Sequence, residues 1–287
     1  MIIDLNKDDM TIAEAIYISK PHDVIILGSK TYKEKVEVDK PYLTFIGSDN
    51  SKITFDAYSN MINPNTGKKY GTTGSTTFRI LDNAHHTTIK NITIENGHIK
   101  DEPDAGQQAV AFKSEASFTL IKNCKFLSYQ DTFYIDNGTD NYVKDSLIEG
   151  DIDFIFGSAN CVFDNCHISS KTFYKIGYYT APSTLAINRY GLVFKNCYFD
   201  QLTPMHTILG RGWYPAGSIS PVLPRVSFID SSFNGDIDMA IITMHEGDPD
   251  IDVSGVKNCT LNGKPFLDFG KVSLEYTNKV INKYKEE

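Results

Sequence analysis

The chain has 287 residues, of which 41% are hydrophobic and 22% are charged, and these proportions exclude a disordered or fibrous chain. Lys and Arg together number 28 against 36 Asp and Glu, which gives a formal net charge of -8. A chain this acidic is a poor candidate for binding nucleic acid or an anionic membrane surface, because both require basic patches.

The N-terminal segment indicates a short helix rather than a signal peptide. Residues 1–10, MIIDLNKDDM, lack the basic stretch and apolar run of a leader. The apolar spacing that follows predicts a helical cap over about residues 8–18. No run of about 18 apolar residues occurs, so we expect no membrane partner. These features predict a cytoplasmic protein, or a secreted one if the natural chain starts further upstream.

A six-residue pattern recurs through the chain: apolar, polar, Asn or Asp, small, any residue, apolar. Clear copies are IKNCKF from Ile121 and FKNCYF from Phe194. Its Asn or Asp stands at positions 91, 123, 145, 165, 196, 230 and 258. The GTTGSTTF segment from Gly71, which lies outside the pattern, is interpreted as a turn followed by a strand.

The pattern predicts an all-β fold, a right-handed parallel β-helix formed by one domain over residues 1–287. Each copy alternates apolar and polar residues, as a strand does, and the loops between copies vary in length. The Asn or Asp is expected at the bend between strands, where these residues tolerate a left-handed conformation, and the small residue is expected to face inward. The segment LEYTNKVINKYKEE predicts a helical tail over about residues 274–287, and helices at both ends are expected to cap the solenoid.

Four of the five cysteines, at positions 124, 166, 197 and 259, occupy the small-residue position of the pattern, and the fifth is Cys161. We interpret them as apolar residues of the solenoid interior. A disulfide between neighbouring coils is the less favoured alternative, since a spacing of about 4.8 Å between coils would permit it.

Three polar segments, GQQAVAF, SYQDTFY and GDIDFIFGSAN, are the candidate site. Gln108 and Gln130 are 22 residues apart, and so are Asp131 and Asp153. If one coil takes 22 residues here, these side chains lie above one another on one face. The LGRGWYP segment adds a cation, Arg211, followed by Trp213.

Two carboxylates on adjacent coils would be roughly 5 Å apart and could not both ionise freely. The protonated one could act as a general acid and the ionised one as a nucleophile, with the glutamines stabilising an oxyanion. Such a pair also suits a retaining glycoside hydrolase, and a non-catalytic carbohydrate-binding solenoid or a thioesterase-like enzyme remains an alternative.

GQQAVAF, YQDTFY, GDIDFIFG and LGRGWYP resemble, in the same order, the four signature segments of the pectin methylesterases. GYYTAPST from Gly177 resembles the bacterial branch of that family especially. The resemblance spans roughly residues 10–260 and implies a right-handed parallel β-helix that removes methyl esters from C6 of galacturonate. It implies no metal or organic cofactor, and its substrate would be methyl-esterified homogalacturonan or oligogalacturonides. We expect a monomer.

The resemblance also implies a role for each matched residue. Asp153 would be the nucleophile and Asp131 the general acid and base, with Gln108 and Gln130 shaping the oxyanion site and Arg211 holding Asp153 ionised. The residues implied in substrate binding are Trp213, Tyr134, Phe156 and Thr77. The chain departs from the family in having Gly212 after the arginine and in lacking a second groove tryptophan, for which Met244 is a candidate substitute.

Overall fold

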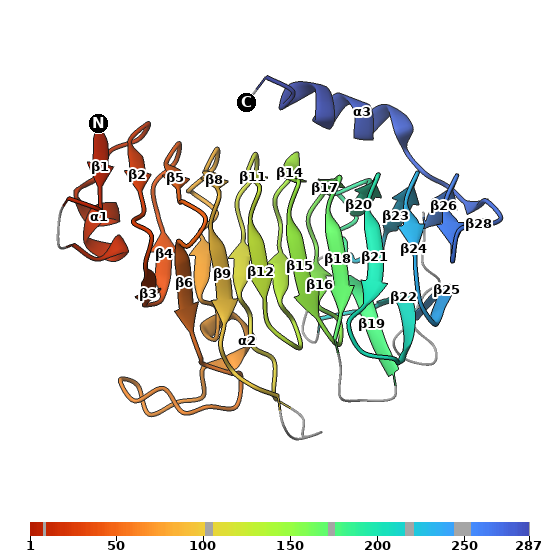
Figure 1. Cartoon of the computed structure of the whole chain (residues 1–287), viewed down its shortest axis with the longest axis horizontal. Helices are drawn as coiled ribbons and strands as arrows, with labels where there is room; N and C mark the ends of the chain where they lie inside the picture. Colours follow the sequence, from red (N-terminus) through yellow and green to blue (C-terminus); the bar gives the residue numbers. More distant parts are fainter. Residues whose placement is uncertain (8–9, 101–105, 172–175, 216–220, 244–253, 287) are drawn as a thin grey trace.

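Three sheets wind around a common axis in the computed structural model, which describes residues 1–7, 10–100, 106–171, 176–215, 221–243 and 254–286 (Figure 1). Successive coils add one strand after another to each sheet, and nearly all neighbouring strands are parallel. The all-β prediction of a right-handed parallel β-helix is confirmed.

The strands of the described residues fall into sheets of eleven, ten and eight, here called A, B and C. Sheet A contains β1 (Ile2–Asp4), β2 (Val24–Ile26), β5 (Thr44–Ile46), β8 (Thr88–Lys90), β11 (Leu120–Lys122), β14 (Asn141–Lys144), β17 (Cys161–Asp164), β20 (Leu192–Lys195), β23 (Val226–Ile229), β26 (Gly255–Lys257) and β29 (Phe269–Gly270). Sheet B contains β3 (Thr31–Lys33), β6 (Lys52–Phe55), β9 (Thr93–Asn96), β12 (Lys125–Leu127), β15 (Leu147–Gly150), β18 (His167–Ser170), β21 (Tyr198–Gln201), β24 (Ser232–Phe233), β27 (Thr260–Leu261) and β28 (Lys264–Pro265). Sheet C contains β4 (Val36–Val38), β7 (Phe78–Ile80), β10 (Phe112–Ser114), β13 (Phe133–Ile135), β16 (Ile155–Gly157), β19 (Ile176–Pro182), β22 (His206–Gly212) and β25 (Ile237–Thr243).

The six-residue pattern is the corner at which the chain passes from sheet A to sheet B. Its Asn or Asp has a positive φ in all seven copies, between 49° at Asp230 and 60° at Asn91. The side chains also bond along the stack, as where Asn165 Nδ2 donates to Asp145 Oδ1 at 2.7 Å. Asn and Asp suit this corner because they tolerate the left-handed conformation and bridge neighbouring coils. The expectation for this position is confirmed.

The interior of the coils is filled by aliphatic and aromatic side chains. Phe163, Phe194 and Phe228 stack on successive strands of sheet A, with ring centroids 4.6 and 5.2 Å apart. All five cysteines are buried and free, so the interpretation as interior residues holds and the disulfide alternative is wrong. Stacking of like residues at matching positions follows from the parallel register.

Helices lie at both ends of the sequence but only partly as expected. Helix α1 (Ile12–Ile18) begins at Thr11, whose side chain forms a capping box with Glu14, and its buried face covers the first coils. The predicted start at residue 8 falls on residues 8–9, which are outside the described part. Helix α2 (Gly71–Gly74) is a single turn where the sequence indicated a turn and strand.

The C-terminal helix α3 (Leu274–Lys283) runs alongside the coils rather than over their open end (Figure 1). Its buried Tyr276 and Val280, with Tyr284, pack on the outer face of sheet A. That face is apolar, with Leu120, Tyr142, Val162, Val193 and Ile229 pointing outward. The last coil is instead followed by antiparallel pairings of β28 with β27 and of β29 with β26. No helix in the described residues is long and apolar enough to cross a membrane.

Candidate active site

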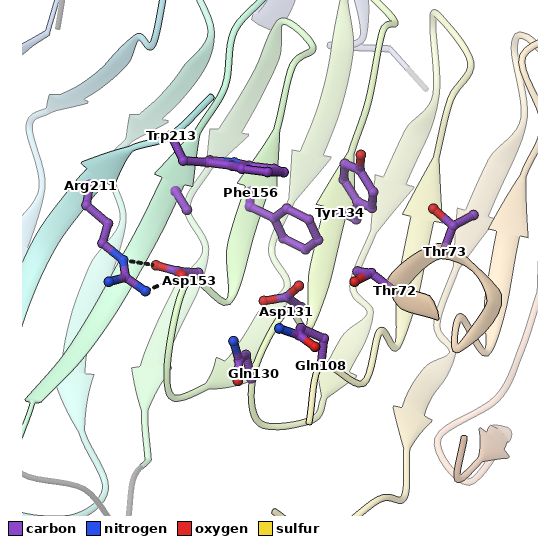
Figure 2. A pocket seen from close by; sticks show the side chains of 11 residues that line it. Thr72, Thr73, Gln108, Gln130, Asp131, Tyr134, Asp153, Phe156, Arg211 and Trp213 are labelled. Atoms are coloured by element: carbon purple, nitrogen blue, oxygen red, sulfur yellow. Dashed lines mark hydrogen bonds and ion pairs between the residues drawn. The ribbon is translucent and has the colours of Figure 1, made fainter. Parts of the chain in front are cut away.

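A pocket of about 360 Å³ opens on the outer face of sheet C. It contains eight of the nine site residues that the sequence predicts. The lining residues are Thr72, Thr73, Gln108, Gln130, Asp131, Tyr134, Asp153, Phe156, Ala181, Arg211 and Trp213 (Figure 2). They come from several coils that are far apart in the sequence, so only the winding of the chain brings them together.

The two aspartates occupy matching positions on adjacent coils. Asp131 lies two residues before Phe133 in β13, and Asp153 lies two residues before Ile155 in β16. Phe133 pairs with Ile155 in the parallel register, and the Asp131 N–H donates to Ile152 O at 3.3 Å. No coil therefore separates the two carboxylates, as the 22-residue spacing indicates.

A left-handed backbone conformation turns both aspartates toward the pocket. In an uninterrupted strand, Asp131 would share the inward face of Phe133, and Asp153 that of Ile155, because side chains alternate. Instead φ is 68° at Asp131 and 53° at Asp153, which breaks the alternation. Aspartate tolerates this conformation, as the Asn and Asp residues of the corners do. Sequence spacing alone could not reveal this device.

Arg211 forms a two-bond ion pair with Asp153. Its Nε donates to Oδ1 at 2.7 Å and its Nη2 donates to Oδ2 at 2.6 Å (Figure 2). The guanidinium also lies over the ring of Tyr178, with Cζ 4.1 Å from the ring centroid. Such a pairing fixes the orientation of the carboxylate and favours its charged form. Tyr178 was not among the predicted site residues, although its segment belongs to the family resemblance.

The environments of the two carboxylates differ in charge. Burial raises the pKa of Asp131 well above its usual range, and the neighbouring Asp153 and Asp151 raise it further. Burial also raises the pKa of Asp153, but the hydrogen bonds and charge of Arg211 oppose that rise. Because Arg211 bonds only one of the two, Asp153 is the group that ionises more readily, and Asp131 keeps its proton to higher pH.

Aromatic rings form one side of the pocket, and amides lie on the other. Tyr134 and Phe156 stack with their ring centroids 4.1 Å apart, and Trp213 packs against the same cluster. Figure 2 shows Gln108 and Gln130 on the opposite side of Asp131 from these rings. The pocket thus offers flat apolar surface for a sugar ring and amide donors near the carboxylates.

The predicted contact of Thr77 with substrate is wrong. Thr77 is fully buried, and its hydroxyl donates to Glu95 O at 3.0 Å. The short helix α2 instead presents Thr72 and Thr73 to the pocket. The sequence contains several threonines in GTTGSTTF, and nothing in that pattern distinguishes the exposed pair from the buried one. Met244 lies outside the described residues.

A charged pair near the carboxylates was also missed. Lys100 Nζ lies 3.1 Å from Asp151 Oδ2, and both side chains are almost completely buried. Among the described residues, no group of three or more His, Cys, Asp or Glu side chains is arranged to hold a metal ion.

The segments that form this pocket are those of a known family. A family model described as pectinesterase matches residues 4–234. The chain belongs to the pectinesterase family. Membership confirms the resemblance seen in the sequence at the level of the family, and the matched range contains Asp131, Asp153 and Arg211.

Named pectinesterases are similar over much of the chain. Pectinesterase 31 of Arabidopsis thaliana is 32% identical over 205 residues, which are 68% of this chain and 62% of the relative. The chain therefore spans less than two thirds of that relative's length. A pectin methylesterase from Yersinia enterocolitica has a TM-score of 0.77 at 27% identity, covering 96% of this chain and 99% of its own. A pectin methylesterase mutant in complex with a hexasaccharide has a TM-score of 0.73 at 25% identity, covering 82% of this chain and 79% of its own.

Proposed function

We propose that this protein hydrolyses the C6 methyl esters of galacturonate units in pectin or oligogalacturonides and releases methanol. The observation that carries the proposal is the pair of adjacent-coil carboxylates in one pocket, of which Arg211 bonds only Asp153. Family membership and the hexasaccharide complex of a related pectin methylesterase support the choice of substrate.

In the first step, the Asp153 carboxylate attacks the ester carbonyl carbon. The carbonyl oxygen gains negative charge, which the amide N–H groups of Gln108 and Gln130 can stabilise as donors. The bond to the methoxy oxygen then breaks, and Asp131 gives its proton to that oxygen so that methanol leaves. The product of this step is an acyl group on Asp153 and an ionised Asp131.

In the second step, Asp131 acts as a base. It takes a proton from water, and the resulting hydroxide attacks the acyl carbon. The bond to Asp153 breaks, which regenerates its carboxylate and the protonated Asp131 and releases a galacturonate carboxyl group. The raised pKa of Asp131 suits this alternation, because a group that exchanges a proton in each step works best with a pKa near the working pH.

A retaining glycoside hydrolase is the nearest alternative, since it also uses two neighbouring carboxylates. The two glutamine amides favour ester chemistry, because cleavage of a glycosidic bond develops no oxyanion at a carbonyl. A binding protein without activity does not require two neighbouring carboxyl groups that differ in their tendency to ionise.

We further propose that the protein acts as a monomer, without nucleic acid or membrane as partner, and that it belongs to the bacterial branch of the family. The net charge of -8 supports the first point, since polyanions would be repelled. The GYYTAPST segment from Gly177 supports the branch assignment.

The decisive experiment measures methanol and new reducing ends from methyl-esterified pectin, for the wild type and for Asp153→Ala. We expect methanol without reducing ends from the wild type and a loss of about 10³-fold or more in the variant. Reducing ends without methanol would establish the glycosidase instead, and the absence of both would contradict both enzyme assignments.

A further inference from the structure

The Lys100–Asp151 ion pair is buried next to the pocket, and the reaction described above uses neither residue. The two side chains are 3% and 0% exposed, and Lys100 Nζ lies 3.1 Å from Asp151 Oδ2. Lysine is rarely buried to this extent, because removing its charge from water is unfavourable and pairing offsets that penalty only in part. Such a pair therefore calls for a role other than stability.

Asp151 connects its own coil to the coils on either side of it. Its N–H donates to Tyr129 O at 3.2 Å, next to Gln130 and Asp131. Its backbone O accepts from the Tyr178 N–H at 3.1 Å, and the Tyr178 ring lies against Arg211.

Asp151 also bonds within the turn that carries Asp153. Its Oδ1 accepts from the Ile152 N–H at 2.6 Å, so the two oxygens of one carboxylate bind the turn and Lys100. A shift of this side chain would therefore move the turn directly before Asp153. Lys100 reaches it from the segment after β9, which is 51 residues earlier in the chain.

The pair also contributes charge to the site. The Lys100 ammonium lowers the pKa of both Asp131 and Asp153, whereas the Asp151 carboxylate raises the pKa of Asp131. Arg211 also lowers the pKa of both carboxylates, and Asp153 raises the pKa of Asp131. Loss of one partner would leave the charge of the other buried without this salt bridge, which is the costly case.

We propose that Lys100 and Asp151 form a positioning ion pair, which fixes the turn carrying Asp153 against the coil carrying Asp131 and balances the charge beside them. This inference rests on the proposed function, because the reaction defines what is positioned. Lys100 acts through Asp151 and does not touch the substrate.

The test compares Lys100→Met, Asp151→Asn, the double variant and Lys100→Arg in methanol release across pH, with thermal unfolding measured in parallel. Each single neutral variant is expected to lower kcat at least tenfold and to leave KM within about twofold, because the pocket walls come from other residues. The double variant should lose less than the product of the two single losses, since it removes both buried charges of the pair together. Lys100→Arg should keep most of kcat.

The pH profile provides a readout that a purely structural role would not change. In Lys100→Met, burial favours the neutral form of Asp151, so its titration should add an ionisation to the kcat profile that the double variant lacks. Lys52→Met is the matched control. It breaks the pair with Glu95 on sheet B, where Nζ lies 2.6 Å from Oε2, and should leave kcat and the pH profile unchanged.

Two results would overturn the inference alone. One is an active wild type whose Lys100→Met variant loses thermal stability but keeps kcat and the pH profile. The other is a Lys52→Met variant with the same kinetic loss as Lys100→Met. If a single variant fails to fold, a double variant with no loss of kcat would also overturn it. A wild type that releases no methanol would instead refute the proposed function, and this inference with it.

Discussion

Asp153 and Arg211 are 58 residues apart in the sequence and are joined by two parallel hydrogen bonds, from Nε to Oδ1 and from Nη2 to Oδ2. Each oxygen of the carboxylate thus has a charged donor on one side, while its remaining lone pairs are available to the pocket. This ion pair favours ionisation of Asp153 over ionisation of Asp131, although both residues are buried to the same extent.

The Arg211 pair predicts a shift in pH dependence. Arg211 lowers the pKa of Asp153, so its removal should raise that pKa. Asp153 must be ionised to attack, and activity is lost as the pH falls through its pKa. The acid limb of kcat/KM in Arg211→Met should therefore move to higher pH, by roughly one unit or more. Arg211→Lys should move it less. Methanol release measured between pH 4 and 9 checks this, and an unmoved acid limb would contradict the assignment.

The two aspartates should differ in the first turnover. Asp131→Asn keeps the nucleophile but has no proton to give, so steady-state turnover should fall by roughly 10²–10⁴-fold. With an ester of a more acidic alcohol, such as trifluoroethanol, the leaving group needs little protonation. Asp131→Asn should then release a burst of about one equivalent of alcohol, and Asp153→Asn should release none. Rapid-quench measurement of the alcohol distinguishes the two variants. A burst from Asp153→Asn alone would reverse the two roles, and bursts from both variants would refute them.

Substitutions at Thr72 and Thr77 should have different effects, on substrate binding in the first case and on stability in the second. Thr72 lines the pocket, so Thr72→Ala should raise KM a few-fold with the unfolding free energy nearly unchanged. Thr77→Val removes the buried hydrogen bond to Glu95 O, so that this carbonyl oxygen loses the hydroxyl donor. The loss should lower the unfolding free energy by about 1–2 kcal/mol. The KM of this variant should match the wild type. Denaturant unfolding and substrate titration of the same preparations check both expectations, and a raised KM in Thr77→Val would reinstate the overturned assignment.

Helix α3 should stabilise the solenoid without serving the site. Tyr276 stacks on Tyr190 with ring centroids 3.8 Å apart and is 5% exposed. Tyr276→Ala should therefore lower the unfolding free energy by about 3 kcal/mol, as for other buried aromatic residues. The pocket lies on sheet C and α3 on sheet A, so kcat and KM below the unfolding temperature should stay at wild-type values. Thermal unfolding with kinetics at low temperature measures both, and a changed KM would indicate coupling between the two faces.

The architecture could be predicted from the sequence because every coil of a solenoid places the same requirements on its residues. Every coil needs a residue that tolerates the left-handed corner between sheets A and B, and Asn or Asp at positions such as Asn91 and Asp145 meets that need by itself. Because the coils stack in parallel, residues that are one coil length apart in the sequence lie side by side on adjacent coils. For this reason the interval of 22 residues between Asp131 and Asp153 indicates adjacent coils from the sequence alone.

Other features depended on the three-dimensional path of the chain. The surface on which α3 packs could not be predicted, because its apolar face fits either an open end of the solenoid or the outer face of a sheet with apolar residues. Thr72 and Thr77 share one short segment, and only the single helical turn at Gly71–Gly74 decides which of them meets the pocket.

The amino-acid sequence by itself determined the repeat, the corner residues, the interior cysteines and the pair of aspartates, because each follows from spacing along one chain, whereas the role of the arginine was implied by the family resemblance. The tertiary structure alone decided how Asp131 and Asp153 turn outward, that Arg211 bonds only one of them, and that Lys100 reaches Asp151. Those contacts join segments separated by loops of irregular length, and their geometry depends on how each loop closes.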